Sequence, residues 1–504
     1  MFLLLSLVVT IFIFTFAFII GRYNERHWKK RGVIFDKRNN LIIGPYYEFL
    51  TGNRALFEIF GDMYTIHTLY RKYRDEPAVG FSTLFTPSLF VIDPKNVQYV
   101  MQGPMFIDRG IDYHKEDYLA DNILFMSGVR WKLMRQKMTP LFTPIKLKNM
   151  YYIIEKRTQD FIQYLHKNPE KQKGNTFNTL STFCCNAIGD AVFGVSYAST
   201  FISPFLDITR KAFSSNWWTD IRFTISSVSP TIFKALKITF FKQFEQFFIG
   251  AMKQVFRQRE KEGVKRHDFA DMCLSLQKSG VMKHEETGFQ MQPTDELLAA
   301  QGFFFFTAGV EPTAAAVFGA MIEIGRHPEI QKRLQEEIDG AFDKNNGQLT
   351  YDAVMGLEYL DKVLTESLRT FPPIGFLTRR CTEETFLPVG NIKIDKGTKI
   401  YIPSYAYHHD PEFFEQPHVF DPERFSDDTK QRLGVIYQPF GFGGRICIGM
   451  RYAKLQVKSV LAHIIHHFDL KTVIGSGGIK FAKDQTQVRI KNVDVVYFPR
   501  KLIS

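Results

Sequence analysis

Cysteine is scarce in this chain of 504 residues, and its five cysteines have no spacing that resembles a disulfide framework. This argues against an oxidised extracellular scaffold and fits a reducing compartment. Familiar ligand motifs are missing as well: there is no G-x-G-x-x-G fingerprint, no phosphate-binding G-K-[ST] and no zinc-ligand cluster. The sequence therefore carries no recognisable nicotinamide or flavin site of its own.

The formal net charge is +12, which favours an anionic partner such as a membrane surface, an acidic protein or nucleic acid. An RNA-binding aromatic signature is also absent, so nucleic acid ranks last and we expect none to bind. Aromatic residues make up 15% of the chain, and phenylalanine alone contributes 50 residues. That abundance favours a large core first and the lining of an apolar cavity second.

Charge is absent from residues 2–20, which are apolar apart from three hydroxyl side chains. As a helix this run would be roughly 28 Å long, enough to cross a bilayer core. A cleaved signal peptide, the alternative, needs a basic segment before the run and a small-residue cleavage site after it, and both are missing. The positive charges follow the run instead, which places that side in the cytoplasm. We expect a transmembrane anchor at 1–21 and a basic linker at 22–45 that contains Arg22, Arg26, Lys29, Lys30 and Arg31.

One stretch near the C-terminus, residues 439–449, carries the strongest chemical signal. Cys447 stands at the start of an apolar helix, where backbone N–H groups and the helix dipole favour a thiolate. Gly443 and Gly449 permit close approaches that a Cβ would forbid. Phe440 would exclude water, and Arg445 offers a fork of donors for a carboxylate. A thiolate, an apolar shield and an arginine for carboxylates describe a haem site. A buried structural cysteine is the alternative. A phosphate loop fails on spacing, because Ile446 stands where G-x-G-x-x-G needs its last glycine and no G-K-[ST] follows.

The five positions just named match F-x-x-G-x-R-x-C-x-G, which resembles the haem-thiolate signature of the cytochrome P-450 monooxygenases. The resemblance implies a mainly α fold with smaller β-sheets, in which a haem lies between a long central helix and the cysteine loop and helix. It implies that residues 46–504 form the catalytic domain. Cys447 would be the axial ligand of the iron in haem b, and Arg445 would hold a propionate.

Two further segments resemble propionate contacts of the family. Trp131 and Arg135 are four residues apart and share a helix face, although by spacing alone a half-buried tryptophan beside a surface arginine is the favoured interpretation. Arg379 lies two residues before Cys381 in a stretch that resembles another contact. Basic side chains near these helices are candidates for a reductase-binding face, and these are Arg130, Lys132, Lys137, Arg451 and Lys454.

A long apolar helix is predicted from Thr294, as its N-cap, to about Arg326. Its middle resembles the family's oxygen-binding A-G-x-[DE]-T at Ala308, Gly309 and Glu311. Pro312 stands where the threonine is expected, and Thr313 follows one position later. Since proline lacks an N–H and clashes with the preceding turn, the helix is expected to open there. We predict proton delivery by Glu311 and water beside Ala308, with Thr313 in partial support. A simple kink that takes Glu311 to solvent is the alternative.

The resemblance also implies a structural network and a substrate cavity. Glu366, Arg369 and Arg424 would form a buried charge network under the haem loop, although such helix pairs are common on surfaces. The cavity would be lined by Ala308 together with Leu124, Phe304, Ile374, Gly375 and Phe376.

Some local expectations are independent of the resemblance. Residues 77–93 form a hairpin broken at 86–88, residues 150–290 are helical, and the tail after Asp469 forms strands. The aromatic segment 201–248 is a candidate roof or membrane contact. His463, His466 and His467 are surface helix residues rather than metal ligands.

The activity that the resemblance implies is insertion of one oxygen atom from O2 into a lipophilic, xenobiotic or hormone-like substrate. Electrons would come from NADPH through a separate cytochrome P-450 reductase, with cytochrome b5 as a further candidate partner, at the endoplasmic reticulum membrane. Residues 32–44 lack the proline-rich hinge usual in microsomal members. An O2-independent haem-thiolate isomerase or dehydratase and a non-catalytic lipophile-binding haem protein are the alternatives, the first because of Pro312.

Overall fold

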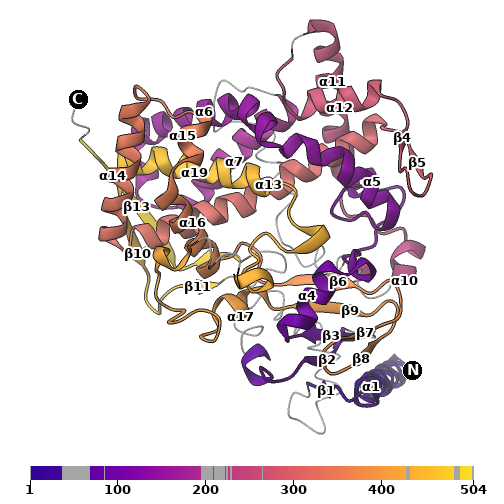
Figure 1. Ribbon diagram of the computed structural model, residues 1–504. Coiled ribbons are helices and arrows are strands. Elements are labelled where there is room, and N and C mark those ends of the chain that lie inside the picture. The colour runs from indigo at the N-terminus through magenta and orange to yellow at the C-terminus, as the bar shows by residue number, and fades with distance from the viewer. Residues whose placement is uncertain are drawn as a thin grey trace.

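The computed structural model describes residues 2–36, 69–83, 86–194, 208, 222, 225–226, 230–263, 265–426, 429, 432–481 and 488–501. The fold is mainly α with small β-sheets, as the sequence predicts. Figure 1 shows two parts: a helical bundle around α13, and the main β-sheet with α1 and α4 beside it. Most of the predicted roof at 201–248, including Trp217 and Trp218, lies outside the described residues.

The central helix α13 runs from Asp295 to Ile324. The Thr294 hydroxyl accepts a hydrogen bond from the Leu297 N–H at 3.3 Å, which confirms the predicted N-cap. The helix ends two residues before the predicted Arg326. It is long and apolar enough to cross a membrane, but 72% of its most apolar stretch is buried, so it is the core helix of this domain.

Proline does not interrupt this helix, and the predicted opening at Pro312 is wrong. The helical backbone continues through Pro312 to Ile324. One missing N–H removes a single backbone bond, and packing along the rest of a long buried helix outweighs that loss. Gly309 lies against Ile188 of α7, where a Cβ would overlap that side chain, so the two helices pack closely.

Neighbouring helices surround α13 in Figure 1. Those that contact it most are α7 (Thr176–Phe193), α11 (Glu245–Glu262), α16 (Glu358–Thr370) and α19 (Met450–His467). The helix that follows His327 is α14 (Pro328–Lys344), and α16 ends at Thr370. The remaining longer helices are α4 (Pro94–Gln102), α5 (Gly128–Met138), α6 (Pro144–Lys167) and α12 (Phe269–Lys278).

The main sheet has the strand order β1-β2-β3-β9-β6. Its strands are β1 (Ile34–Phe35), β2 (Ala78–Thr83), β3 (Thr86–Val91), β9 (Lys399–Ile402) and β6 (Leu377–Arg380). Strands β2 and β3 form the predicted hairpin, but residues 86–88 belong to β3 rather than to its break. The polar residues there sit at the start of the strand, where Pro87 is tolerated.

Short antiparallel pairs complete the fold. The predicted tail strands are β10 (Phe468–Ile474) and β13 (Val493–Pro499), which pair along their length. A second hairpin, β11 (Lys480–Phe481) with β12 (Ile490–Lys491), lies near the C-terminus. Strands β4 (Met282–Lys283) and β5 (Gln290–Met291) interrupt the region predicted as helical, and β7 (Thr385–Leu387) pairs with β8 (Ile392–Ile394).

The N-terminal helix α1 runs unbroken from Phe2 to Lys29, through the predicted boundary at residue 21. The described apolar side chains between Leu5 and Ile19 are exposed, with Phe12 at 70% and Ile19 at 59%. Its last turn packs against the sheet: Trp28 is fully buried and lies so close to Gly80 of β2 that a Cβ there would overlap the indole. Arg31, just beyond the helix, pairs with Asp395 at 2.6 Å.

The predicted surface position of His463 on α19 is wrong. This residue is 3% exposed, and its Nε2 lies 3.1 Å from the Glu155 carboxylate of α6. His466 is half-buried beside Asp339, at 2.7 Å. Helix α19 is packed on more sides than an amphipathic surface helix. His463 and His466 thus each lie beside a carboxylate. Among the described residues no group of three metal-ligating side chains occurs.

Candidate functional site

The loop before α19 is shaped by glycines in left-handed conformations. Gly441 and Gly443 have φ values of +79° and +68°, which side chains disfavour. A Cβ on Gly443 would also overlap the backbone carbonyl of Met101 in α4. The predicted close approach is therefore real at Gly443. At Gly449 the backbone is ordinary and the nearest atom to a Cβ is 3.8 Å away, so packing within the protein does not require glycine there.

This loop presents Cys447 three residues before the first turn of α19. The Cys447 N–H donates to the Phe440 carbonyl at 2.8 Å, which closes the loop around the cysteine. Phe440 is half-buried against the helical core. The loop thus holds the sulfur at a fixed place between α4, α5 and α19.

Cys447 is solvent-accessible, yet burial by the surrounding protein raises the pKa of its thiol. We interpret this combination as a sulfur that faces an internal space. The Gly449 N–H and the nearby Arg109 and Arg135 oppose the increase, because each favours the anion. The predicted bias toward a thiolate is present but is outweighed by desolvation. A cation bound at the sulfur would reverse that balance.

Four arginines gather around this space without carboxylate partners. Burial lowers the pKa of Arg109 to about 10, that of Arg379 to about 9 and that of Arg445 to about 8, and it also lowers the pKa of Arg135. Mutual repulsion adds to burial for Arg109, Arg379 and Arg445. Among the described residues no ion pair joins any of the four to an acid. Buried cations are costly without an anion, so the site fits a ligand that carries carboxylates.

Arg445 is held more firmly than the sequence indicates. Its Nε, Nη1 and Nη2 donate to the carbonyls of Ile107, Ile123 and Met126 at 2.5, 3.1 and 2.6 Å. Its guanidinium lies 4.0 Å from the centre of the Trp131 ring. An arginine has five N–H groups, so two remain for a ligand beyond these three. Arg445 therefore fixes the walls of the site while keeping donors for a carboxylate.

The resemblance described above implies that α13 forms the opposite wall of the site, and one face of this helix is accessible. Most of this helix is buried, but Ala308 is exposed and Phe304, Glu311 and Pro312 keep accessible surface. These positions are spaced i, i+4, i+7 and i+8, so they share one face. Thr313 is 4% exposed and lies off that face, because one residue rotates a side chain by about 100°. The structure thus brings Ala308 and Glu311 together and does not bring Thr313 to them.

Glu311 forms an ion pair that the sequence does not reveal. Its Oε2 accepts a hydrogen bond from Nη2 of Arg489 at 2.6 Å. The Glu311 side chain is 15% exposed and that of Arg489 is 31% exposed. The alternative in which a kink takes Glu311 to bulk solvent is therefore wrong. A carboxylate with a fixed cationic partner can remain in a largely apolar wall.

The predicted cavity residues come from three separate segments. Leu124 and Phe376 are half-buried, and Ile374 is 40% exposed. Gly375 is buried, and its carbonyl accepts the Tyr405 N–H at 2.8 Å, so it shapes the segment rather than lining it with a side chain. Phe304 keeps accessible surface, whereas Phe303 and Phe306 pack against Phe248 in the core.

The predicted charge network is present and buried. Glu366 and Arg369 are both fully buried and form a two-pronged ion pair with distances of 2.7 and 2.8 Å. Arg424 adds a contact of 3.3 Å to the same carboxylate. Arg369 also donates to the His408 carbonyl at 2.8 Å, which ties α16 to the segment that leads to the Cys447 loop. These contacts support a structural role.

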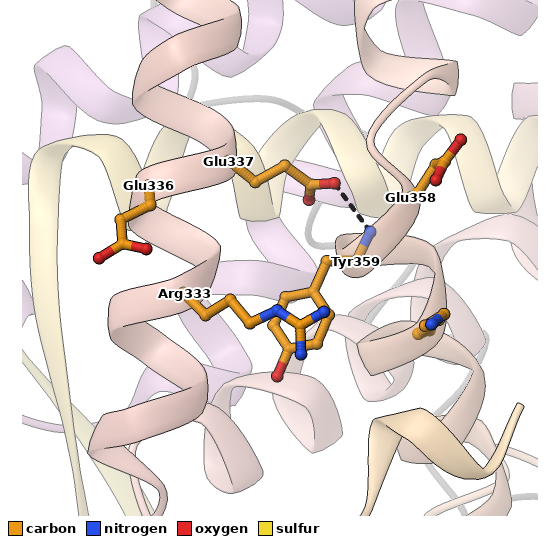
Figure 2. A pocket seen from close by; sticks show the side chains of 6 residues that line it. Arg333, Glu336, Glu337, Glu358 and Tyr359 are labelled. Carbon is orange, nitrogen blue, oxygen red and sulfur yellow. Dashed lines mark hydrogen bonds between the residues drawn. The ribbon is translucent and has the colours of Figure 1, made fainter.

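A surface cleft of about 340 Å³ lies between α14 and α16, and none of its lining residues belongs to the predicted site. Figure 2 shows the Glu337 carboxylate directed at the Tyr359 N–H at the start of α16, and Arg333 over the Tyr359 ring at 3.8 Å. Arg333 and Lys362 also pair with Glu423 at 2.6 Å each. These charges are engaged by the protein itself, and the cleft is best explained as a helix junction.

Comparison with known proteins now decides the family. A model of the Cytochrome P450 family matches residues 45–492. This chain belongs to the cytochrome P450 family. Similar proteins include Cytochrome P450 6B2 of Helicoverpa armigera, 30% identical over 92% of each chain, and Cytochrome P450 6a2 of Drosophila melanogaster, 31% identical over 88% of this chain and 89% of that protein. Cytochrome P450 6k1 of Blattella germanica is 28% identical over 92% of this chain and 91% of that protein.

Membership makes this P450 a monooxygenase, and the family implies a haem iron, a redox partner and a lipophilic substrate. The geometry fits that cofactor on two independent features. An accessible sulfur at the end of a glycine-shaped loop suits an iron ligand, and four arginines without acid partners suit a group that carries carboxylates. The predicted haem-thiolate site agrees with the surrounding protein.

Two residues of the site escaped the sequence interpretation. Arg109 stands in an Asp-Arg-Gly stretch at residues 108–110, and nothing local indicates that it reaches the space near Cys447. Arg489 belongs to the strand-like tail, 178 residues from Glu311 in sequence. Only the tertiary fold brings either residue to the site.

Proposed function

We propose that this P450 is a membrane-associated enzyme of the endoplasmic reticulum that inserts one atom of O2 into a lipophilic substrate, either a xenobiotic or a hormone-like compound. The single observation that carries the proposal is the accessible Cys447, which lies among Arg109, Arg135, Arg379 and Arg445, none of which forms an ion pair with an acid in the described part of the chain. The electrons come from NADPH through a separate reductase, and cytochrome b5 is a second candidate donor. The insect relatives of the P450 6 series support this assignment.

Haem b would be held by Cys447 as the iron ligand, with Arg445, Arg109, Trp131, Arg135 and Arg379 around its propionates. The bound haem supplies one-electron chemistry and O2 activation, and the thiolate favours O–O cleavage. The residues of this chain then have three tasks. Phe440 shields the sulfur from water, Glu311 delivers protons, and Thr313 provides at most weak support from its buried position.

The substrate side is apolar. Ala308, Phe304, Leu124, Ile374 and Phe376 present aliphatic and aromatic surface, with Gly375 setting the path of the last segment. Such a lining binds by burial of apolar area, at roughly 25 cal/mol per Å², and selects for size and shape more than for polar groups. This supports a lipophilic substrate without specifying which one.

The N-terminal helix is the proposed membrane anchor. Large exposed apolar side chains, among them Leu5 at 62% and Phe12 at 70%, are unfavourable in water over so long a helix. Basic residues follow on its C-terminal side, so the catalytic domain faces the cytosol. The docked Trp28 and the Arg31 pair with Asp395 continue the helix directly into the domain, which supports a stiff connection in place of the missing proline hinge.

The reductase is proposed to dock on the side of α5 and α19. Lys132 and Arg451 are exposed and Lys137 is half-buried, whereas Arg130 pairs with Asp121 and Lys454 lies 3.6 Å from Asp361. The best candidates for contact with an acidic surface are the three side chains that form no ion pair within the described residues, namely Lys132, Lys137 and Arg451.

The proposal is tested with the haem-loaded full-length protein in vesicles that also contain P450 reductase. A panel of lipophilic compounds is scored first by the shift of the haem spin state and then by product analysis. NADPH-dependent oxygenated product from at least one compound is expected. Binding without any product would favour a lipophile-binding protein, and product formed without O2 would favour an isomerase or dehydratase.

A further inference from the structure

The middle of α13 has one residue on its accessible face that carries an ionisable group. Between Phe304 and Pro312 the positions with accessible surface are Phe304, Phe305, Ala308, Gly309, Glu311 and Pro312. Thr307 is buried and donates to the Phe304 carbonyl at 3.1 Å, and Thr313 is also buried. Among these accessible positions of α13, Glu311 alone carries an ionisable or hydroxyl side chain.

The backbone on both sides of Arg489 is held by the fold. The Val488 N–H donates to the Pro373 carbonyl at 2.9 Å, and Ile490 pairs with Phe481 in the β11–β12 hairpin. Phe481 in turn contacts Phe371 and Tyr405, with ring centres 6.5 and 6.1 Å away. The hairpin therefore packs on the segment that leads to the predicted substrate residues Ile374–Phe376.

The ion pair with Arg489 acts on the Glu311 carboxylate in two ways. The positive charge favours the ionised form of Glu311, and the short bond to Oε2 restricts the rotation of the carboxylate. A proton donor in a reaction cycle must lose and regain its proton with a defined orientation. The hydrogen bond from Arg489 gives the carboxylate its defined orientation. The positive charge of Arg489 influences how readily Glu311 loses and regains its proton.

We propose that Arg489 is a positioning residue that holds Glu311 for proton delivery, so that the ion pair of α13 with the C-terminal hairpin belongs to the proton path of this enzyme. The inference rests on the proposed monooxygenase function. That reaction converts substrate, O2, NADPH and one proton to hydroxylated substrate, water and NADP+. For each proton that it delivers, Glu311 takes one proton from water, and no electrons pass through the pair.

The test uses haem-loaded full-length protein with reductase and a compound that the panel above shows to be oxidised. Arg489→Gln removes the charge and keeps much of the length, whereas Arg489→Lys keeps the charge. We expect Arg489→Gln to lower product per NADPH roughly threefold to tenfold, as for groups in direct contact, with more peroxide and an altered solvent isotope effect. Arg489→Lys is expected to recover at least half of the loss.

The matched control is Arg333→Gln, which removes another arginine whose guanidinium pairs with a glutamate at 2.6 Å, on the surface helix α14. Product per NADPH is expected to stay at the wild-type value in this variant. Each variant is first checked for haem content and for the carbon monoxide spectrum of a thiolate-ligated haem. A change confined to stability would alter these quantities and leave product per NADPH of the loaded enzyme unchanged, which would overturn the proposal.

A double-variant cycle isolates the pair. In a Glu311→Gln background, Arg489→Gln is expected to change product per NADPH by less than about twofold, because its target is already gone. An equal loss in both backgrounds would overturn the inference, since Arg489 would then act independently of Glu311. If Glu311→Gln alone has no effect, the proton role of Glu311 fails and the inference fails with it. The monooxygenase function would still stand on the oxygenated product.

Discussion

The two walls of the site are built on different principles. Around Cys447 every position of the predicted signature is met, and the loop is fixed by Gly443, by the carbonyl contacts of Arg445 and by the ring of Trp131. On α13 the expected threonine position is Pro312, the next hydroxyl is buried, and Glu311 pairs with a distant arginine.

The residues that would hold the cofactor, around Cys447, are thus distinct from those that would deliver protons to it, on α13. Ligand binding needs a sulfur, an apolar shield and cations at set places, and small shifts of the loop would spoil all of them. Proton delivery needs an ionisable group with a path to water, which different residues can supply. Many contacts therefore fix the loop around Cys447. On α13, in contrast, the residues that deliver protons can differ from the family pattern.

The largest expected effect is the loss of the ligand itself. Cys447→Ser replaces a thiolate donor with a hydroxyl, and we expect product formation to fall below detection together with the thiolate-type carbon monoxide spectrum. Cys381→Ser is the control, because that buried thiol donates to the Glu383 carbonyl at 2.7 Å and a hydroxyl can replace it there. Retained product in Cys447→Ser would break the assignment of this wall.

The next effect concerns the network beneath the cysteine wall. Glu366→Gln leaves the fully buried Arg369 without its anion, and breaking a buried pair costs about 3 to 5 kcal/mol. A lower midpoint of denaturant unfolding and a lower yield of haem-loaded protein are expected. Glu423→Gln, which breaks surface pairs with Arg333 and Lys362, should cost about 1 kcal/mol or less. If the two variants lost equal amounts of stability, the buried network would not be a support of the haem-binding loop.

A third effect tests the shape of the loop. Gly443→Ala places a Cβ at a position whose backbone is left-handed, and this Cβ overlaps the Met101 carbonyl. We expect the free energy of unfolding to fall by about 2 kcal/mol or more. The adjacent Gly444→Ala has its nearest neighbour at 3.9 Å and no such backbone. We expect only the first to lower haem content in a titration of the expressed protein. If both variants load haem normally, the close approach is unimportant.

The smallest effects belong to the α13 wall. Thr313→Ala removes a buried hydroxyl off the accessible face, so we expect product per NADPH to change by less than about twofold. Pro312→Thr adds a hydroxyl to that face and should raise product per NADPH by about twofold or less, since Glu311 already supplies the proton. A large loss in Thr313→Ala would show that its hydroxyl reaches the site after all.

Local patterns predicted the parts of this molecule that depend on near neighbours. The Thr294 cap and the shape of the Cys447 loop follow from residues within a few positions of each, so near neighbours determine both. The pairing of Glu366 with Arg369 also followed from their local spacing, but the prediction that the pair is buried came only from the family resemblance.

Residues whose role depends on distant packing were not predictable in the same way. Pro312 was expected to open α13, yet the buried helix around it continues. His463 looked like a surface residue and is covered by α6. Arg109 and Arg489 reach the site from segments far away in the sequence, and their charges look like ordinary surface charges until the fold is known.

Isotope-labelled O2 tests the central claim most directly. The haem-loaded enzyme is incubated with reductase, NADPH, an oxidised compound and labelled O2, and the product is analysed by mass spectrometry. The account predicts one labelled oxygen atom in each product molecule, and loss of that product in Cys447→Ser. A product without label, or the same product formed in the absence of O2, would contradict it.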